Sequence, residues 1–209
     1  MPQAIALVDA GFLKAEGART LHVKTQQVAP DARGCITHLK SLAAAEGSTL
    51  LRAYWYDGAF ESGDPRFQSQ RPYLDAISSC PGVQMRPGHI RETTPTWQHA
   101  VKKAIANCGV TLADFEKHFQ FRPVLEQKGV DTLIVLDLVR LAQRRAYDIA
   151  FLIAGDRDLA EAVRVAQDEG RRVILLHPAG GGVATELRHL ADEVRSLDEP
   201  TLRKMLKIK

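Results

Sequence analysis

The sequence of 209 residues lacks the features that mark membrane proteins, secreted proteins and histidine-based metal sites. No apolar run approaches the about 20 residues that a membrane-spanning helix needs, and no basic segment leads into an apolar one at the N-terminus. The 3 cysteines have no C-x-x-C spacing, and the 7 histidines form neither H-x-x-x-H nor H-E-x-x-H. We therefore expect a cytoplasmic protein without disulfides or membrane contact, in which any metal ligands are oxygen atoms.

Hydrophobic residues make up 45% of the chain and charged residues 25%, which is ordinary for one globular α/β domain. Lys and Arg number 28 against 25 Asp and Glu, of which four belong to the candidate site described below. A basic surface around an acidic pit is a reasonable arrangement for a nuclease, because the bases attract a polyanion. A generic solvated basic surface is the alternative.

Strand-sized apolar runs alternate with segments of helical periodicity along most of the chain. Such alternation predicts an α/β fold with a mostly parallel central sheet and helices on both faces. Residues 1–198 are predicted to form a single domain with an insertion at about residues 91–127, and residues 199–209 a basic C-terminal tail. We expect strands at residues 5–8, 50–56, 82–90, 148–154, 173–176 and 194–197, and helices at 31–46, 65–79, 130–145, 159–169 and 184–191. The first strand should end in a turn at residues 9–11, and the third should be interrupted near Pro87 and Gly88.

Four aspartates stand where these elements begin or end. Asp9 and Asp156 follow apolar strands, and ligands of parallel sheets bind outside the carboxyl ends of the strands. Asp131 and Asp158 fall in the first turns of helices, where free N–H groups favour a carboxylate. Clustered carboxylates repel one another unless a cation lies between them, so together they suit Mg²⁺ or Mn²⁺.

Each aspartate also has a simpler interpretation. Asp131 and Asp158 are the acids commonly found at helix starts, and Asp9 is a turn-forming residue before Gly11. Two other phosphate-binding classes are excluded by the first strand. A haloacid-dehalogenase-like phosphatase needs D-x-D there, where Gly11 stands, and a dinucleotide-binding protein needs the absent G-x-G-x-x-G.

Several motifs resemble the NYN domain, a family of the PIN-like nuclease superfamily. The family pattern is K-G-V-D, an aspartate six residues on, and S-G-D-x-D-F. This chain has Q-K-G-V-D at 127–131, Asp137, Y-D at 147–148 and A-G-D-R-D-L at 154–159, with further similarity at residues 8–13 and 52–57. Phe12 stands where many NYN proteins carry an asparagine, and Ala154 and Leu159 replace serine and phenylalanine.

The resemblance implies a Rossmann-like PIN/NYN fold and a metal-dependent ribonuclease that hydrolyses RNA phosphodiester bonds. It gives catalytic, metal-binding roles to Asp9, Asp131, Asp156 and Asp158, with Mg²⁺ or Mn²⁺ as cofactor and RNA, taken to be single-stranded, as partner. A non-catalytic RNA-binding or regulatory protein of the same fold is the alternative. The assembly stays open; a homodimer is the commonest among soluble oligomers.

Three further residues receive subsidiary roles. Asp137 lies about 240° around the predicted helix from Asp131, so we expect it to support the ligands rather than bind the metal. Lys128 and Arg52 are candidate contacts for substrate, with an ordinary surface position as the alternative for Lys128.

Overall fold

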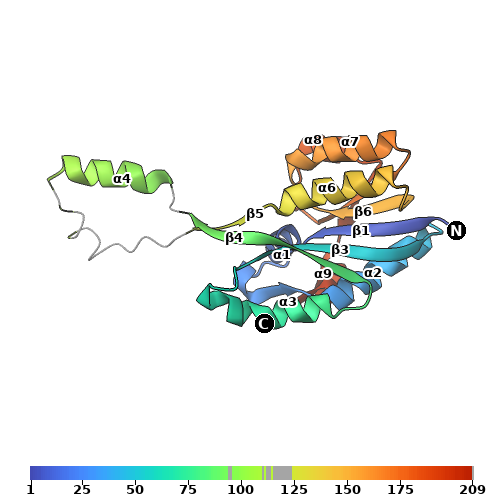
Figure 1. The fold of residues 1–209 in the computed structure, drawn as a ribbon, viewed down its shortest axis with the longest axis horizontal. Coiled ribbons are helices and arrows are strands. Elements are labelled where there is room, and N and C mark those ends of the chain that lie inside the picture. Colours follow the sequence, from blue (N-terminus) through green and yellow to red (C-terminus); the bar gives the residue numbers. More distant parts are fainter. Residues whose placement is uncertain (94–95, 110, 112–113, 115–123, 209) are drawn as a thin grey trace.

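The computed structural model describes residues 1–93, 96–109, 111, 114 and 124–208. Seven strands form one sheet in the order β5–β4–β3–β1–β6–β7–β8, and every neighbouring pair is parallel except β4–β5. The predicted α/β fold with a mostly parallel sheet is therefore confirmed (Figure 1). The strands are β1 (Gln3–Asp9), β3 (Thr49–Ala59), β4 (Val83–Thr93), β5 (Val124–Lys128), β6 (Ile149–Ile153), β7 (Arg172–Pro178) and β8 (Glu193–Leu197).

Helices cover both faces of this sheet (Figure 1). Alternate side chains of β1 enter two separate cores, because successive residues of a strand point to opposite faces. Ile5 and Leu7 pack under the helices of one face, and Ala4, Ala6 and Val8 under those of the other. The first face carries α6 (Val130–Gln143), α7 (Ala160–Asp168) and α8 (Thr185–Leu190), and the second α1 (Ala10–Thr20), α2 (Ala32–Ala45), α3 (Pro65–Ser78) and α9 (Glu199–Met205).

Two local predictions were wrong. The chain enters α1 directly after β1, where a turn at residues 9–11 was expected, and Asp9 is the residue that caps this helix. β4 also continues through Pro87 and Gly88 without the expected break. Gly88 instead permits a close approach, because a Cβ there would lie 2.9 Å from the carbonyl oxygen of Lys128.

The predicted basic C-terminal tail is part of the folded domain. The segment forms α9 and then β9 (Leu206–Ile208), which pairs antiparallel with β2 (Val28–Pro30). Leu202, Met205 and Leu206 are buried, and a Cβ on Gly34 of α2 would overlap the carbonyl oxygen of Lys204. Charge alone suggested a tail, but the apolar residues between the charges pack into the core.

The segment predicted as an insertion begins and ends within the sheet, as β4 and β5. Between them, α4 (Thr96–Asn107) lies beyond the end of the β4–β5 pair (Figure 1). Residues 94–95, 110, 112–113 and 115–123 lie outside the described residues. The predicted insertion at about residues 91–127 is therefore described only in part.

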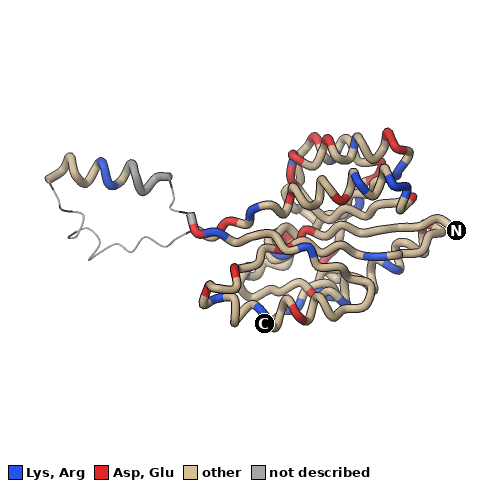
Figure 2. The backbone as a smooth tube through the Cα atoms, in the orientation of Figure 1, with Lys and Arg blue, Asp and Glu red and all other residues tan. Residues whose placement is uncertain are grey.

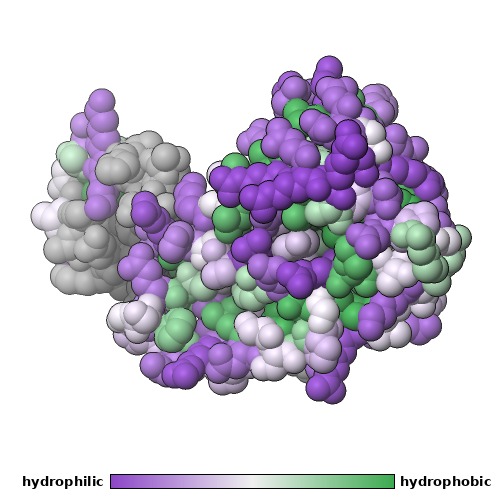
Figure 3. Space-filling view, turned by 45° about the vertical axis from the view of Figure 1, so that its right-hand side comes forward, coloured by the Kyte–Doolittle hydropathy of each residue, from purple (hydrophilic) through white to green (hydrophobic). Residues whose placement is uncertain are grey.

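Acidic and basic residues are spread over all parts of the folded body (Figure 2), and the face in Figure 3 is hydrophilic with hydrophobic areas between the polar ones. Several arginines bind nearby acids; Glu46 and Glu193, for example, each pair with both Arg172 and Arg195. Cys35, Cys80 and Cys108 are free thiols. Within the described ranges, no helix combines the length and apolarity required to cross a bilayer.

We predict that Leu202→Ala destabilises the protein by about 2–5 kcal/mol, because it opens a cavity where α9 packs on the core. Arg203→Ala, on the exposed side of the same helix, should change stability by about 0.5 kcal/mol or less. Urea denaturation of both variants measures the difference. Equal stability of Leu202→Ala and the parent protein would mean that residues 199–208 are not part of the folded core.

Candidate metal centre at the carboxyl edge of the sheet

Asp9 occupies the junction between the central strand and the first helix. It is the last residue of β1, and its Oδ1 accepts a hydrogen bond of 2.9 Å from the backbone N–H of Phe12 in α1. Only 8% of the residue is exposed, because β1 is covered on both faces. The strand ends here and the helix begins at once, so the carboxylate is fixed at the carboxyl edge of the sheet.

Two further aspartates reach the same edge from other elements. β6 runs parallel to β1 and ends at Ile153, opposite Val8, so the loop that follows carries Asp156 beside Asp9. Asp131 lies in the first turn of α6, after Gly129 turns the chain with a positive φ of 84°. Asp9, Asp131 and Asp156 line one pocket of about 270 Å³. The structure thus gathers three of the four predicted ligands.

Asp158 lies at the margin of this group. It sits in a short 3-10 turn (Arg157–Leu159), is exposed, and does not line the pocket. It is nevertheless close enough to act on Asp131 electrostatically. The pKa of Asp131 is raised by its burial first, and then by the charges of Asp156 and Asp158.

The environment of Asp9 disfavours its negative charge. Burial is the main cause that raises the pKa of Asp9 to about 7, and the charges of Asp131, Asp156 and Asp57 add to the effect. The hydrogen bond from Phe12 opposes it. A carboxylate that is buried and surrounded by like charges is stabilised by a cation.

The donor set fits a hard divalent cation in its chemistry, and its three aspartates line one pocket. Every donor is a carboxylate oxygen, as Mg²⁺ and Mn²⁺ prefer. Among the described residues, no three His, Cys, Asp or Glu side chains already stand together in a cation-holding group. Asp9, Asp131 and Asp156 would therefore have to turn toward a shared ion.

Phe12 shapes the pocket with an apolar surface. Its ring lines the pocket and lies over Gly155, where any Cβ would overlap it. The Gly-Asp turn after β6 therefore packs on α1 through the ring of Phe12. Many NYN proteins carry asparagine at the position of Phe12. No oxygen ligand comes from this position, and the three aspartates are left to supply the donors.

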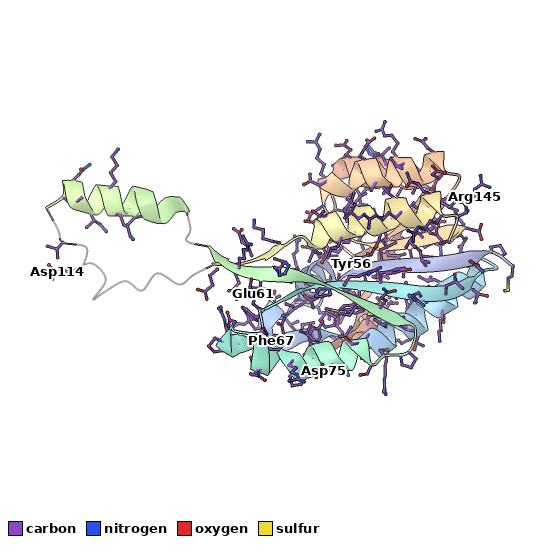
Figure 4. All side chains as sticks on the ribbon, viewed as in Figure 1. Tyr56, Glu61, Phe67, Asp75, Asp114 and Arg145 are labelled. Atoms are coloured by element: carbon purple, nitrogen blue, oxygen red, sulfur yellow. The ribbon has the colours of Figure 1, made fainter. Side chains whose placement is uncertain are left out.

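Asp137 does not line the acidic pocket, and its contacts are with β3 and β4. Its Oδ2 accepts a hydrogen bond of 2.9 Å from the Tyr56 hydroxyl and lies 3.0 Å from Nε of Arg86. Tyr56 is the β3 residue in register with Asp9, and Figure 4 shows it in the middle of the body. These contacts fix α6 against the strand beside Asp9.

The structure does not bring the two predicted substrate contacts into the pocket. Arg52 pairs in register with Ile5, at the opposite part of β1 from Asp9, and donates a hydrogen bond of 2.8 Å to Gln84. Lys128 is close to Asp131 in the chain, but it is exposed and forms an ion pair of 2.7 Å with Glu126. Arg145 lies at the far end of α6 from the pocket (Figure 4).

Two side chains near the site were not among the predicted residues. Gln127 lines the acidic pocket and donates a hydrogen bond of 3.0 Å to Asp57. Asp57 follows the buried residues of β3, so the strand-end argument used for Asp9 would have found it. Its carboxylate also accepts hydrogen bonds from the Tyr73 hydroxyl and the Gly58 N–H, both of 2.8 Å. With three donors, Asp57 is a structural link rather than a free ligand.

The sequence profile of the NYN domain matches residues 21–198. The chain belongs to the NYN domain family. Asp131, Asp156 and Asp158 lie within the matched range, whereas Asp9 precedes it and joins the site through β1. Membership implies a PIN-like nuclease family, whose members generally depend on divalent metals.

Comparisons with curated sequences and solved structures give three matches, of which VPA0982 supports the fold. The uncharacterized protein y4oD of Sinorhizobium fredii is 44% identical over 86 residues, which cover 40% of this chain and 40% of that protein. A Vibrio parahaemolyticus protein of unknown function, VPA0982, is 18% identical, with a TM-score of 0.55 over 98% of this chain and 96% of that chain. MurG of Acinetobacter baumannii is 10% identical, with a TM-score of 0.39 over 94% of this chain and 42% of MurG.

We predict that Asp9→Asn makes the metal-free NYN domain more stable than the parent, and increasingly so from about pH 4 to about pH 7. The pKa of Asp9 is raised in the folded state, so across this range the folded protein holds a proton that the unfolded chain has lost. The stability of the parent therefore falls as the pH rises toward about 7, whereas asparagine stays neutral and can still cap α1.

Asp64→Asn is the matched control, because Asp64 also caps a helix, α3, but has the opposite shift. A hydrogen bond from Arg66 lowers the pKa of Asp64 to about 2, so its contribution to stability is constant above the ordinary aspartate range. Thermal melts in EDTA measure both series. If the melting temperature of Asp9→Asn changed with pH in parallel with that of the parent, the burial of an uncompensated charge at Asp9 would be contradicted.

Proposed function

We propose that this NYN domain is a divalent-metal-dependent ribonuclease that hydrolyses RNA phosphodiester bonds at Asp9, Asp131, Asp156 and Asp158. The observation that carries the proposal is the placement of three carboxylates from β1, α6 and the loop after β6 in one pocket. Like charges in such a position destabilise one another, and a cation relieves that repulsion. An arrangement that costs stability in the metal-free protein is explained by a function that needs it.

In this proposal the chain's own residues hold and orient the cation. Asp9, Asp131 and Asp156 bind it, and Asp158 adds negative charge at the rim. With Mg²⁺ or Mn²⁺ held by these carboxylates, the site would gain a Lewis acid that could activate a water and offset charge on the phosphate. Asp137 and Tyr56 keep α6 and β3 in place, and Phe12 covers the side of the pocket against Gly155.

RNA as the substrate comes from the family, and the pocket is compatible with it. The acidic pocket is open at the surface, so an extended backbone has access to it. The second candidate function is a non-catalytic RNA-binding or regulatory protein. It is favoured by the finding that, in the described ranges, no three ligand-type side chains already form a cation-holding group.

The decisive experiment is cleavage of single-stranded RNA by the purified protein with Mg²⁺, with Mn²⁺, and with EDTA. We expect cleavage with a metal and none with EDTA. Asp156→Asn should lower the rate by more than the about 10- to 100-fold typical of losing a residue that supports a metal ligand. Asp168→Asn, an exposed aspartate at the end of α7, should cleave at the parent rate. A folded protein that cleaves RNA with neither metal is the non-catalytic candidate.

Metal binding has a readout of its own. We predict that Mn²⁺ raises the melting temperature of the parent and of Asp168→Asn, because an ion bound only by the folded state stabilises it. Asp9→Asn and Asp156→Asn should lose most of this shift. An equal Mn²⁺ shift in all four proteins would place the ion elsewhere and remove the metal centre from the proposal.

A further inference from the structure

A second pocket lies directly beside the acidic one. Its volume is about 330 Å³, at the lower end of the about 300–1,000 Å³ of small-molecule sites. Its lining comes from α1, β2, the end of β3 and the loop after it, α3, β4 and β5. Gly11 and Gln127 line both pockets, so a ligand in one is adjacent to a ligand in the other.

The walls of this pocket combine ring surfaces with amide groups. Phe60, Tyr73 and Ile90 supply apolar surface, and Gln26 and Gln127 supply side-chain amides. A splayed base of a single strand is recognised by this pair of features, because its face stacks on a ring and its edge hydrogen-bonds. A double helix keeps its bases stacked inside and presents none of them to such a pocket.

Hydrogen bonds hold the pocket open in a fixed shape. Gln70 donates a bond of 2.7 Å to the Gly58 carbonyl and accepts one of 3.0 Å from the Phe60 N–H. The guanidinium carbon of Arg66 lies 4.4 Å from the centre of the Phe60 ring and so fixes its orientation. Gly58 is required here, because a Cβ would lie 2.8 Å from Cγ of Gln127.

Two polar side chains of the lining form no direct bond within the described structure. In the part of the chain that the structure describes, the side chains of Lys14 and Gln26 make neither a hydrogen bond nor an ion pair. Burial raises the pKa of Asp57 of the same lining, and the charge of Lys14 opposes that rise. Lys14 is half-buried on α1, about one helical turn from Gly11, and Gln26 is exposed at the rim. An ammonium group next to the acidic pocket suits a backbone phosphate, and a free amide suits a base edge.

We propose that this pocket binds one nucleobase of the RNA strand whose phosphate is held at the acidic pocket, with Lys14 against the adjoining phosphate. The inference rests on the proposed function and narrows its substrate to single-stranded RNA. Phe60 supplies the stacking surface, and Gln26 reads the base edge. Binding of this base fixes the position of the strand, so that the neighbouring phosphodiester bond lies at the acidic pocket.

The test compares three probes in EDTA by fluorescence anisotropy: a short single-stranded RNA, its fully abasic counterpart, and the RNA duplex of the same sequence. We expect the parent to bind the single strand about 5- to 150-fold more tightly than the abasic strand, as loss of one stacked base predicts. Gln26→Ala and Phe60→Leu should shrink this ratio, whereas Phe67→Leu, on the neighbouring α3, should keep it (Figure 4).

The same RNA is then incubated with Mn²⁺, so that the two proposals are tested separately. Cleavage together with equal binding of the abasic strand overturns the base pocket and leaves the nuclease intact. A ratio that depends on Phe60, without cleavage, supports the base pocket in a non-catalytic RNA-binding protein. Three results overturn the base pocket. The duplex binds as tightly as the single strand, or no RNA binds at all. In the third, Phe60→Leu and Gln26→Ala leave the ratio of single-strand to abasic-strand affinity unchanged.

Discussion

The site depends on the burial of a charged group at the end of β1. Because both faces of this strand are covered, its last residue, Asp9, is buried away from water. Its negative charge there lowers the free energy of unfolding of the metal-free protein. Because β6 runs parallel beside β1, the loop that carries Asp156 must emerge at the same edge. A parallel sheet thus concentrates negative charge at one edge, where it is costly without a cation.

The antiparallel strand β5 gives this edge its second wall. It pairs with β4 and ends at Lys128, and after Gly129 the helix α6 begins and places Asp131 at the carboxyl edge of the sheet. Gln127 on this strand separates the acidic pocket from the pocket lined by Phe60 and Tyr73. One short strand therefore positions Asp131 and forms a wall of both pockets. A ligand in the second pocket consequently lies next to the candidate metal ligands.

The sequence predicted the elements well where apolar periodicity was strong, as in α2, α6 and β6. It missed α1, whose glycines at 11 and 17 weaken any helical pattern. Gly17 is required by packing, since a Cβ there would meet the side chain of Leu206. α9 and β9 were missed for a related reason: the core contacts of Leu202 and Met205 come from residues far away in the chain.

The sequence by itself determined the family and proposed four aspartates as candidate ligands, because motifs and strand ends are local features. Tertiary structure decided which residues meet: Asp9, Asp131 and Asp156 share a pocket, Asp158 lies at its margin, and Arg52 lies away from it. Register and strand order set these distances, and both depend on contacts between segments that are far apart in the chain. Only the fold could place Gln127 at the acidic pocket and Lys14 in the pocket next to it, since both are ordinary surface residues in the sequence.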